Sequence, residues 1–198
     1  LTVSNAELPN SYKSVENIMA LEQVMTSTYV RAGKVSEALL SLYKVGDKRK
    51  SNYYNELTTT TAIVRKGGGG DYRSTFRSAE FYLIAAEAEA SLGQLDAAKT
   101  HLKALMQKRY TAAFYTRYAT QLDALSKEEL LKYIADERAR ELAFEGHRWF
   151  DLRRTSRPSM QKTYNGSTYK LNENDSRYTL RFPTDAVEAN PNIVKMAQ

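Results

Sequence analysis

Two glutamates one helical turn apart, Glu137 and Glu141, have the spacing in this sequence that most suggests acid–base catalysis. A glycosidase uses such a pair, with one carboxyl group protonated as the acid and the other ionised. Here Arg138 and Arg140 stand between them, and neighbouring guanidinium groups hold carboxyl groups ionised rather than raising the pKa of one of them. We therefore interpret the pair as part of a structural network of charges.

The other candidates for catalysis or metal binding are two histidines, His101 and His147, and no metal-binding spacing links them. The sequence contains no cysteine, which excludes disulfides, thiolate zinc sites and cysteine nucleophiles. It also lacks the glycine-flanked serine of a nucleophile elbow. We therefore expect a protein that is not an enzyme, with no catalytic residue, no bound metal and no cofactor.

The stretch from Asp136 to Arg154 carries acidic and basic residues through an apolar helical pattern, which is costly unless each buried charge has a partner. On one continuous helix, a single stripe would contain Leu131, Ala135, Arg138, Leu142, Glu145 and Trp149. We predict that Arg138 and Glu145 are buried in ion pairs, so that Arg138→Ala destabilises the fold sharply and Arg140→Ala does not. The structural charge cluster would consist of Arg138, Glu141, Glu145, Arg148 and Asp151.

Tyrosine is unusually frequent, with 14 tyrosines against 6 phenylalanines and 1 tryptophan. Because tyrosine combines an apolar ring with a polar hydroxyl group, it suits half-wet surfaces that bind polar ligands. The best candidates for ligand contacts lie beside polar turns and are Tyr53, Tyr54, Tyr164 and Tyr169. Trp149 lies on the apolar stripe, so we expect it in the core.

The first part of the chain predicts short elements. The residues from Ser36 to Tyr43 are typical of an amphipathic helix that Ser36 caps, and Thr58 to Lys66 is β-branched, which favours a strand. Glu16 to Thr28 fits either a helix or a buried strand. No Gly-Lys-Ser/Thr follows Gly67 to Gly70, so we interpret this run as a flexible linker and not as a phosphate loop.

A helical pattern begins at Ser78. The helix over Phe81 to Leu92 should end at Gly93, and a second apolar stripe follows it. The two helices resemble one tetratricopeptide unit, and one unit needs further helices to cover its open face. Ser126 and Glu129 form a capping box that begins the long charged helix.

The tail from Met160 to Gln198 is rich in turn residues. We expect a turn at Asn165-Gly166 and a short strand from Tyr178 to Phe182.

The net charge of +6 is spread along the chain, with tight basic clusters only at Lys48 to Lys50 and at Arg153-Arg154. Nucleic-acid-binding proteins usually combine a basic stripe with a recognisable module, so we predict no nucleic-acid partner. No apolar run reaches the length of a membrane span, and no signal peptide opens the chain. A chain of 198 residues fits one domain with a sizeable core.

Four sequence blocks occur in the order of a known family pattern. They are Leu42 to Lys50, Arg77 to Ala88, the run ERARELAFEGHRWFDLRR from Glu137 to Arg154, and Phe182 to Asn192. On these blocks the sequence resembles the C-terminal portion of the SusD/RagB family, which consists of surface glycan-binding lipoproteins of Bacteroidota.

The resemblance implies a fold class that is mainly α: a tetratricopeptide-like α-α superhelix with loop-rich insertions and a few short strands. It implies one SusD-like C-terminal region over residues 1–198. Within this region we expect an irregular, loop-rich part at 1–77, a helical part at 78–155 and a loop-rich tail at 156–198.

The resemblance further implies non-catalytic binding of an oligosaccharide or polysaccharide, with docking on a SusC-like TonB-dependent transporter for nutrient uptake. It implies a surface-exposed position at the outer membrane, held only by a lipid anchor upstream of this chain. The alternative is a tetratricopeptide-like interaction module that binds a partner peptide or protein.

Overall fold

The structure of the protein is a computed structural model, which describes residues 8–11, 14–20, 35–56, 62–66 and 75–190. The glycine run Gly67–Gly70 lies outside these residues, as do parts of Glu16–Thr28 and Thr58–Lys66. The chain divides into two compact units, which meet in the sequence between Glu145 and Gly146.

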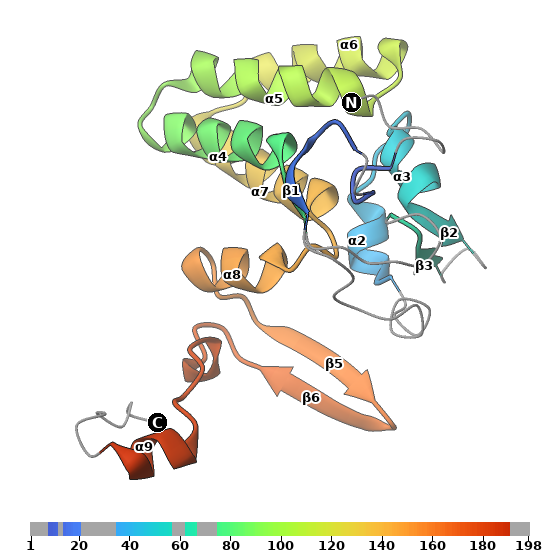
Figure 1. Ribbon diagram of the computed structural model, residues 1–198. Coiled ribbons are helices and arrows are strands. Elements are labelled where there is room, and N and C mark those ends of the chain that lie inside the picture. Colours follow the sequence, from blue (N-terminus) through green and yellow to red (C-terminus); the bar gives the residue numbers. More distant parts are fainter. Residues whose placement is uncertain (1–7, 12–13, 21–34, 57–61, 67–74, 191–198) are drawn as a thin grey trace. The chain divides into compact units, whose positions relative to one another are not determined.

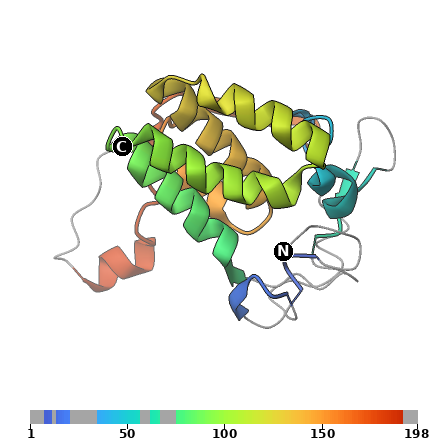
Figure 2. The same ribbon diagram turned by 90° about the horizontal axis from the view of Figure 1, so that it is seen from above.

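A bundle of helices forms the centre of the first unit (Figure 1). Its members are α4 (Ser78–Ser91), α5 (Leu95–Arg109), α6 (Ala112–Asp123) and α7 (Lys127–Glu141). Helix α4 packs against α5 and α7, and α5 also packs against α6, as Figure 2 shows from above. The predicted fold class, mainly α and tetratricopeptide-like, is confirmed, and α6 and α7 supply the helices that the α4–α5 pair needs.

Small side chains let α4 and α5 approach closely. Ala86 and Ala90 of α4 and Ala98 of α5 have no exposed surface, and they lie in one apolar cluster with Leu83 and Leu102. Because an alanine side chain adds little bulk between two backbones, the helices can bury their facing sides along much of their length.

The helix ends follow the sequence signals. Helix α4 ends before Gly93, whose φ of 83° is readily adopted by glycine. At the start of α7, the Ser126 side chain accepts a hydrogen bond from the backbone N–H of Glu129, and the Glu129 carboxylate accepts one from the backbone N–H of Ser126. The predicted capping box is therefore confirmed.

Short elements precede the bundle in the sequence. They are β1 (Asn17–Ala20), α2 (Glu37–Ser41), α3 (Lys48–Tyr53), β2 (Tyr54–Glu56), β3 (Ala62–Val64) and β4 (Thr75–Arg77). Strand β1 pairs antiparallel with β4, and β2 with β3. Ser36 caps α2 by accepting from the backbone N–H of Leu39, as predicted. In the ambiguous segment that starts at Glu16, the described residues form a turn at Glu16 and then strand β1.

The prediction of one continuous helix through the charged block is wrong. Helix α7 ends at Glu141, and Phe144 and Gly146 adopt left-handed φ values of 63° and 88°. The carbonyl groups at the end of α7 have other donors: Lys66 Nζ donates to the Glu141 carbonyl at 2.5 Å, and Arg77 Nη2 donates to it at 2.7 Å. Because two buried cations satisfy the Glu141 carbonyl, α7 can end there without leaving that carbonyl unpaired.

The second unit contains α8 (His147–Arg154), β5 (Met160–Tyr164), β6 (Ser167–Leu171), a 3-10 helix η1 (Ser176–Tyr178) and α9 (Thr184–Ala189). The half-buried Trp149 stacks on the buried Tyr178, with ring centres 5.0 Å apart. The strand predicted from Tyr178 to Phe182 is wrong, because Asp175 caps η1 there and the following residues form no strand. In the described part of the chain, no helix has the length and apolar character needed to cross a bilayer.

Candidate functional site

The last turns of α7 carry charged side chains into the interior of the first unit, where they meet charges from distant parts of the chain. We call this group the charge network. Its basic members are Arg49, Lys66, Arg77, Arg109 and Arg140, and its acidic members are Glu16, Asp47, Glu137, Glu141 and Glu145. These five positive and five negative groups balance to a formal charge of zero, so each buried charge can be offset by another.

Glu141, the last residue of α7, has no exposed surface and is shared by three arginines. Its Oε1 accepts hydrogen bonds from Arg77 Nη1 at 2.6 Å and from Arg109 Nη2 at 2.9 Å. Its Oε2 accepts from Arg49 Nη1 at 2.8 Å and from Arg109 Nε at 3.0 Å. One carboxylate therefore joins α3, β4, α5 and α7.

Asp47 and Glu137 hold Arg49 from two sides. The Asp47 carboxylate caps α3 by accepting from the Arg49 backbone N–H at 3.0 Å, and it also accepts from Arg49 Nε at 2.9 Å and Nη2 at 2.7 Å. Arg49 Nη1 donates to Glu137 Oε1 at 2.5 Å. The start of α3 is thus fixed to α7 by charge-assisted hydrogen bonds.

Glu145 closes the network after α7 has ended. Its carboxylate accepts from Arg77 Nε at 2.9 Å and Nη2 at 2.7 Å, and it also pairs with the Lys66 ammonium group. The same two cations bind the carbonyl of Glu141, so they hold both the end of α7 and the residue that follows the turn.

Three glutamates of the network, Glu137, Glu141 and Glu145, stay ionised near neutral pH and cannot act there as general acids. Burial would raise the pKa of Glu137, but the guanidinium groups of Arg49 and Arg140 outweigh burial and lower this pKa to about 2. At Glu145 the surrounding cations also outweigh burial, and they lower the pKa to about 2. At Glu141 they hold the pKa well below its usual range. Since a general acid must hold a proton at the working pH, we assign the network a structural role.

The residues expected in one charge cluster lie in different surroundings. Glu141 and Glu145 are in the charge network. Arg138 is buried beside a carboxylate of α4, with 3.9 Å between the charged atoms. In the second unit, Arg148 is exposed, and Asp151 pairs with an arginine one turn later on α8 at 2.8 Å.

Arg140 is buried and paired in the network, which the sequence analysis did not predict, so we now expect the opposite order of effects for the two arginines. It is 2% exposed, donates to Glu137 Oε2 at 3.0 and 2.6 Å, and donates to the Leu42 carbonyl at 3.1 Å. We expect Arg140→Ala to lower the free energy of unfolding by about 3–5 kcal/mol, because Glu137 loses a buried partner. Arg138→Ala should lower the free energy of unfolding by a smaller amount, because the ion pair between Arg138 and Glu87 is long, at 3.9 Å, and Glu87 is part-exposed. Urea unfolding of both variants measures the difference, and equal losses would contradict this ranking.

Sequence reasoning did not identify Arg49, Arg77 and Arg109 as members of the network. A partial signal was present, because Arg49 and Arg77 stand in two of the four sequence blocks. Arg109 stands in none of them, and only the packing of α5 against α7 brings it to Glu141.

Tyr53 and Tyr54 are buried beside the charge network. This corrects the prediction that they lie exposed beside a polar turn. They are 0% and 2% exposed. The Lys66 ammonium group lies 5.0 Å from the centre of the Tyr53 ring. The Tyr54 hydroxyl group is 2.8 Å from that of Tyr43, which donates to the Arg140 carbonyl. A ring face attracts a nearby cation, so Tyr53 stabilises the buried Lys66. Because both tyrosines are buried, neither presents an exposed ring for a ligand.

Tyr164 and Tyr169 are exposed on a β-hairpin of the second unit, with 68% and 61% of their surface accessible. Strands β5 and β6 pair antiparallel around Asn165-Gly166, whose φ values of 48° and 77° fit a two-residue type I′ turn. Tyr164 lies opposite Ser167, and Tyr169 lies opposite Lys162. Residues that face each other, and residues two apart on one strand, share a face, so the two tyrosines are diagonal neighbours on the same face.

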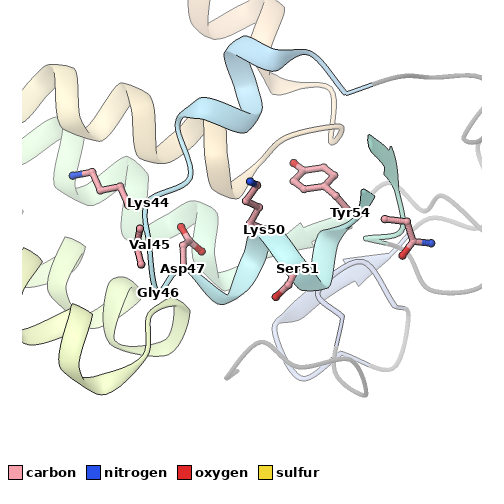
Figure 3. A pocket seen from close by; sticks show the side chains of 8 residues that line it. Lys44, Val45, Gly46, Asp47, Lys50, Ser51 and Tyr54 are labelled. Atoms are coloured by element: carbon pink, nitrogen blue, oxygen red, sulfur yellow. The ribbon is translucent and has the colours of Figure 1, made fainter. Parts of the chain in front are cut away.

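A pocket of about 670 Å³ lies beside the start of α3 in the first unit. Figure 3 shows its lining, which consists of Lys44, Val45, Gly46, Asp47, Lys50, Ser51, Tyr54 and Asn55. The lining offers ammonium, hydroxyl and amide groups. Its aromatic surface is small, because Tyr54 is only 2% exposed.

Metal chemistry has no support in the part of the chain that the structure describes, where no three His, Asp or Glu side chains are arranged to hold an ion. His101 Nε2 lies 3.3 Å from a carboxylate oxygen of Glu89 on the surface of α4 and α5. His147 is the first residue of α8.

Solved structures with a similar fold include a SusD superfamily protein from Bacteroides fragilis. It is 23% identical to the chain, with a TM-score of 0.70, and the match covers 93% of this chain and 46% of that one. A candidate sugar-binding protein from Bacteroides vulgatus is 21% identical, with a TM-score of 0.65 and coverage of 91% and 45%. The chain therefore spans about half the length of these two proteins.

None of the curated proteins compared matches the chain. The model of the SusD family, in contrast, matches residues 21–196, which is most of the sequence. All four sequence blocks lie in this range, and three of them contribute to the charge network. The chain belongs to the SusD family.

Proposed function

We propose that this chain is part of a non-catalytic glycan-binding protein of a SusC/SusD-type nutrient uptake system. The observation that carries this proposal is the match to the SusD family over residues 21–196. The likeness to a candidate sugar-binding protein of the same fold supports it.

The hairpin of β5 and β6 is the best-supported place for a glycan contact. Tyr164 and Tyr169 present their rings from one face and are more than half exposed. A sugar ring has apolar C–H groups on its faces and hydroxyl groups at its edge, so it matches a tyrosine ring with a polar hydroxyl group. Two such rings side by side suit a ligand with at least two sugar residues.

The absence of catalysis in this proposal rests on the state of the paired glutamates. Glu137 and Glu141 have no exposed surface, and buried arginines keep both ionised. A retaining or inverting glycosidase needs one protonated carboxyl group at the substrate, and neither glutamate meets that requirement.

The further parts of the proposal come from family membership. We propose that the whole protein sits at the cell surface on the outer membrane, where a lipid anchor upstream of this chain holds it. Its partner would be a SusC-like TonB-dependent transporter, which imports the captured oligosaccharide.

A second candidate function, capture of a partner peptide or protein, has one observation in its favour. Helix α4 and its C-terminal cap residue expose apolar side chains: Phe81 is 46% exposed, Ile84 47% and the cap residue Leu92 76%. An apolar helix side of this kind can pack against another helix. The exposed tyrosine pair favours a glycan over this alternative.

Calorimetric titration of the chain against neutral glycans, acidic glycans and peptides tests the proposal. We expect at least one glycan to bind and to remain intact in the recovered mixture. Tyr164→Ala and Tyr169→Ala should each weaken binding roughly 3- to 10-fold, as the loss of one stacking contact predicts. Tyr82→Ala is the matched control, because Tyr82 is also an exposed tyrosine (41%) but lies on α4.

Two results would count against the proposal. Cleavage of a bound glycan would exclude a non-catalytic role. Binding of a peptide but of no glycan, with loss of binding in a Phe81→Ser variant of α4, would favour the interaction module.

A further inference from the structure

Lys162 lies between the two exposed tyrosines of the hairpin. It is directly opposite Tyr169 and two residues before Tyr164, so all three side chains share one face. We call this the tyrosine–lysine face. The other face of the hairpin carries Gln161, Thr163, Thr168 and Lys170.

The positive charge of Lys162 is not balanced locally. The segment from Ser159 to Leu171 contains Lys162 and Lys170 and no aspartate or glutamate. Within the described residues, no carboxylate forms an ion pair with Lys162, while the nearby Asp175 is engaged by Arg177 at 2.7 Å. The tyrosine–lysine face therefore presents one cation between two aromatic rings.

We propose that the tyrosine–lysine face selects acidic glycans, in which a uronate carboxylate meets Lys162 while neighbouring sugar rings stack on Tyr164 and Tyr169. This inference rests on the proposed function and names the class of its ligand. The aliphatic part of a lysine side chain can lie along an aromatic surface while its ammonium group stays in water. A stacked sugar excludes part of that water, so a carboxylate at the right edge gains a charge-assisted hydrogen bond that a neutral sugar lacks.

A matched pair of ligands tests the inference: an oligosaccharide of galacturonic acid, and the same oligosaccharide with its carboxylates methyl-esterified. We expect the acidic form to bind about three- to tenfold more tightly than the ester at low salt, and this preference to shrink as salt is added. Lys162→Gln should abolish the preference.

Lys170→Gln is the matched control, because it removes the same charge from the same strand pair but from the opposite face. It should keep the preference. If Lys170→Gln reduces the preference as much as Lys162→Gln, the preference comes from the overall charge of the hairpin and the inference is overturned.

The inference and the proposed function can fail separately. If the acidic oligosaccharide and its ester bind equally well through Tyr164 and Tyr169, selection by Lys162 is excluded while glycan binding stands. If neither form of this oligosaccharide binds but a neutral glycan does, selection of acidic glycans is likewise excluded while glycan binding stands. If no glycan binds at all, the proposed function fails and the inference fails with it.

Discussion

Glu141→Gln is expected to be among the most destabilising single substitutions in this protein, with a loss of about 3–5 kcal/mol in the free energy of unfolding. The glutamine keeps the size of the side chain but removes the negative charge. Arg49, Arg77 and Arg109, which are at most 1% exposed, would then share a neutral group that offers one acceptor oxygen in place of two. Because domains of this size are stable by only about 5–15 kcal/mol, the variant should be close to unfolding.

Urea unfolding followed by circular dichroism measures this loss. Glu128→Gln is the matched control, because Glu128 lies on the same helix but is exposed, and surface substitutions usually change stability by less than about 0.5 kcal/mol. If Glu141→Gln is as stable as Glu128→Gln, the charge network does not hold the first unit together.

The second large effect is expected from acid. The pKa values of Glu137 and Glu145 are lowered from 4.5 to about 2 in the folded protein. A group with a lowered folded pKa stabilises the fold fully above its unfolded pKa, and this contribution disappears as the pH falls through the folded pKa. The difference of about 2.5 units corresponds to roughly 3 kcal/mol for each carboxylate, at about 1.4 kcal/mol per unit.

We therefore expect the free energy of unfolding to be constant from about pH 7 to pH 5 and to fall steeply between about pH 5 and pH 2. Urea titrations at fixed ionic strength measure it at several values of pH. A free energy of unfolding that stays level from pH 5 to pH 3 would show that these carboxylates are not held ionised by the fold.

Local signals predicted the local structure of this chain well. The capping box at Ser126, the cap at Ser36 and the helix end at Gly93 each depend on a few neighbouring residues, and all three are present. The family resemblance predicted the helical fold class. These predictions succeeded because hydrogen bonds within one turn, or a pattern along one helix, decide the outcome.

Long-range pairing explains what the sequence did not reveal. Glu141 meets Arg49, Arg77 and Arg109 across separations of 92, 64 and 32 residues, and no periodicity connects them. The break after α7 was misjudged for the same reason, because Lys66 and Arg77, distant in the sequence, satisfy the Glu141 carbonyl that a longer helix would have paired.

The candidate site shows the same limit. Tyr53 and Tyr54 follow a basic turn, which indicated an exposed loop, but both rings are buried, and Tyr53 lies against the Lys66 ammonium group. Tyr164 and Tyr169 follow a simpler rule, since a two-residue turn fixes the register of the hairpin and brings them to one face. The sequence predicted the turn at Asn165-Gly166 but not the two strands that pair on either side of it.

The most direct test of the central claim is to titrate one glycan into the protein and into its Tyr164→Ala/Tyr169→Ala variant, and to measure thermal unfolding of both. If the hairpin is the binding site and the charge network is purely structural, the variant should bind at least about tenfold more weakly while its melting temperature stays the same. Unchanged glycan affinity in the folded variant would contradict the account, because the ligand would then bind elsewhere.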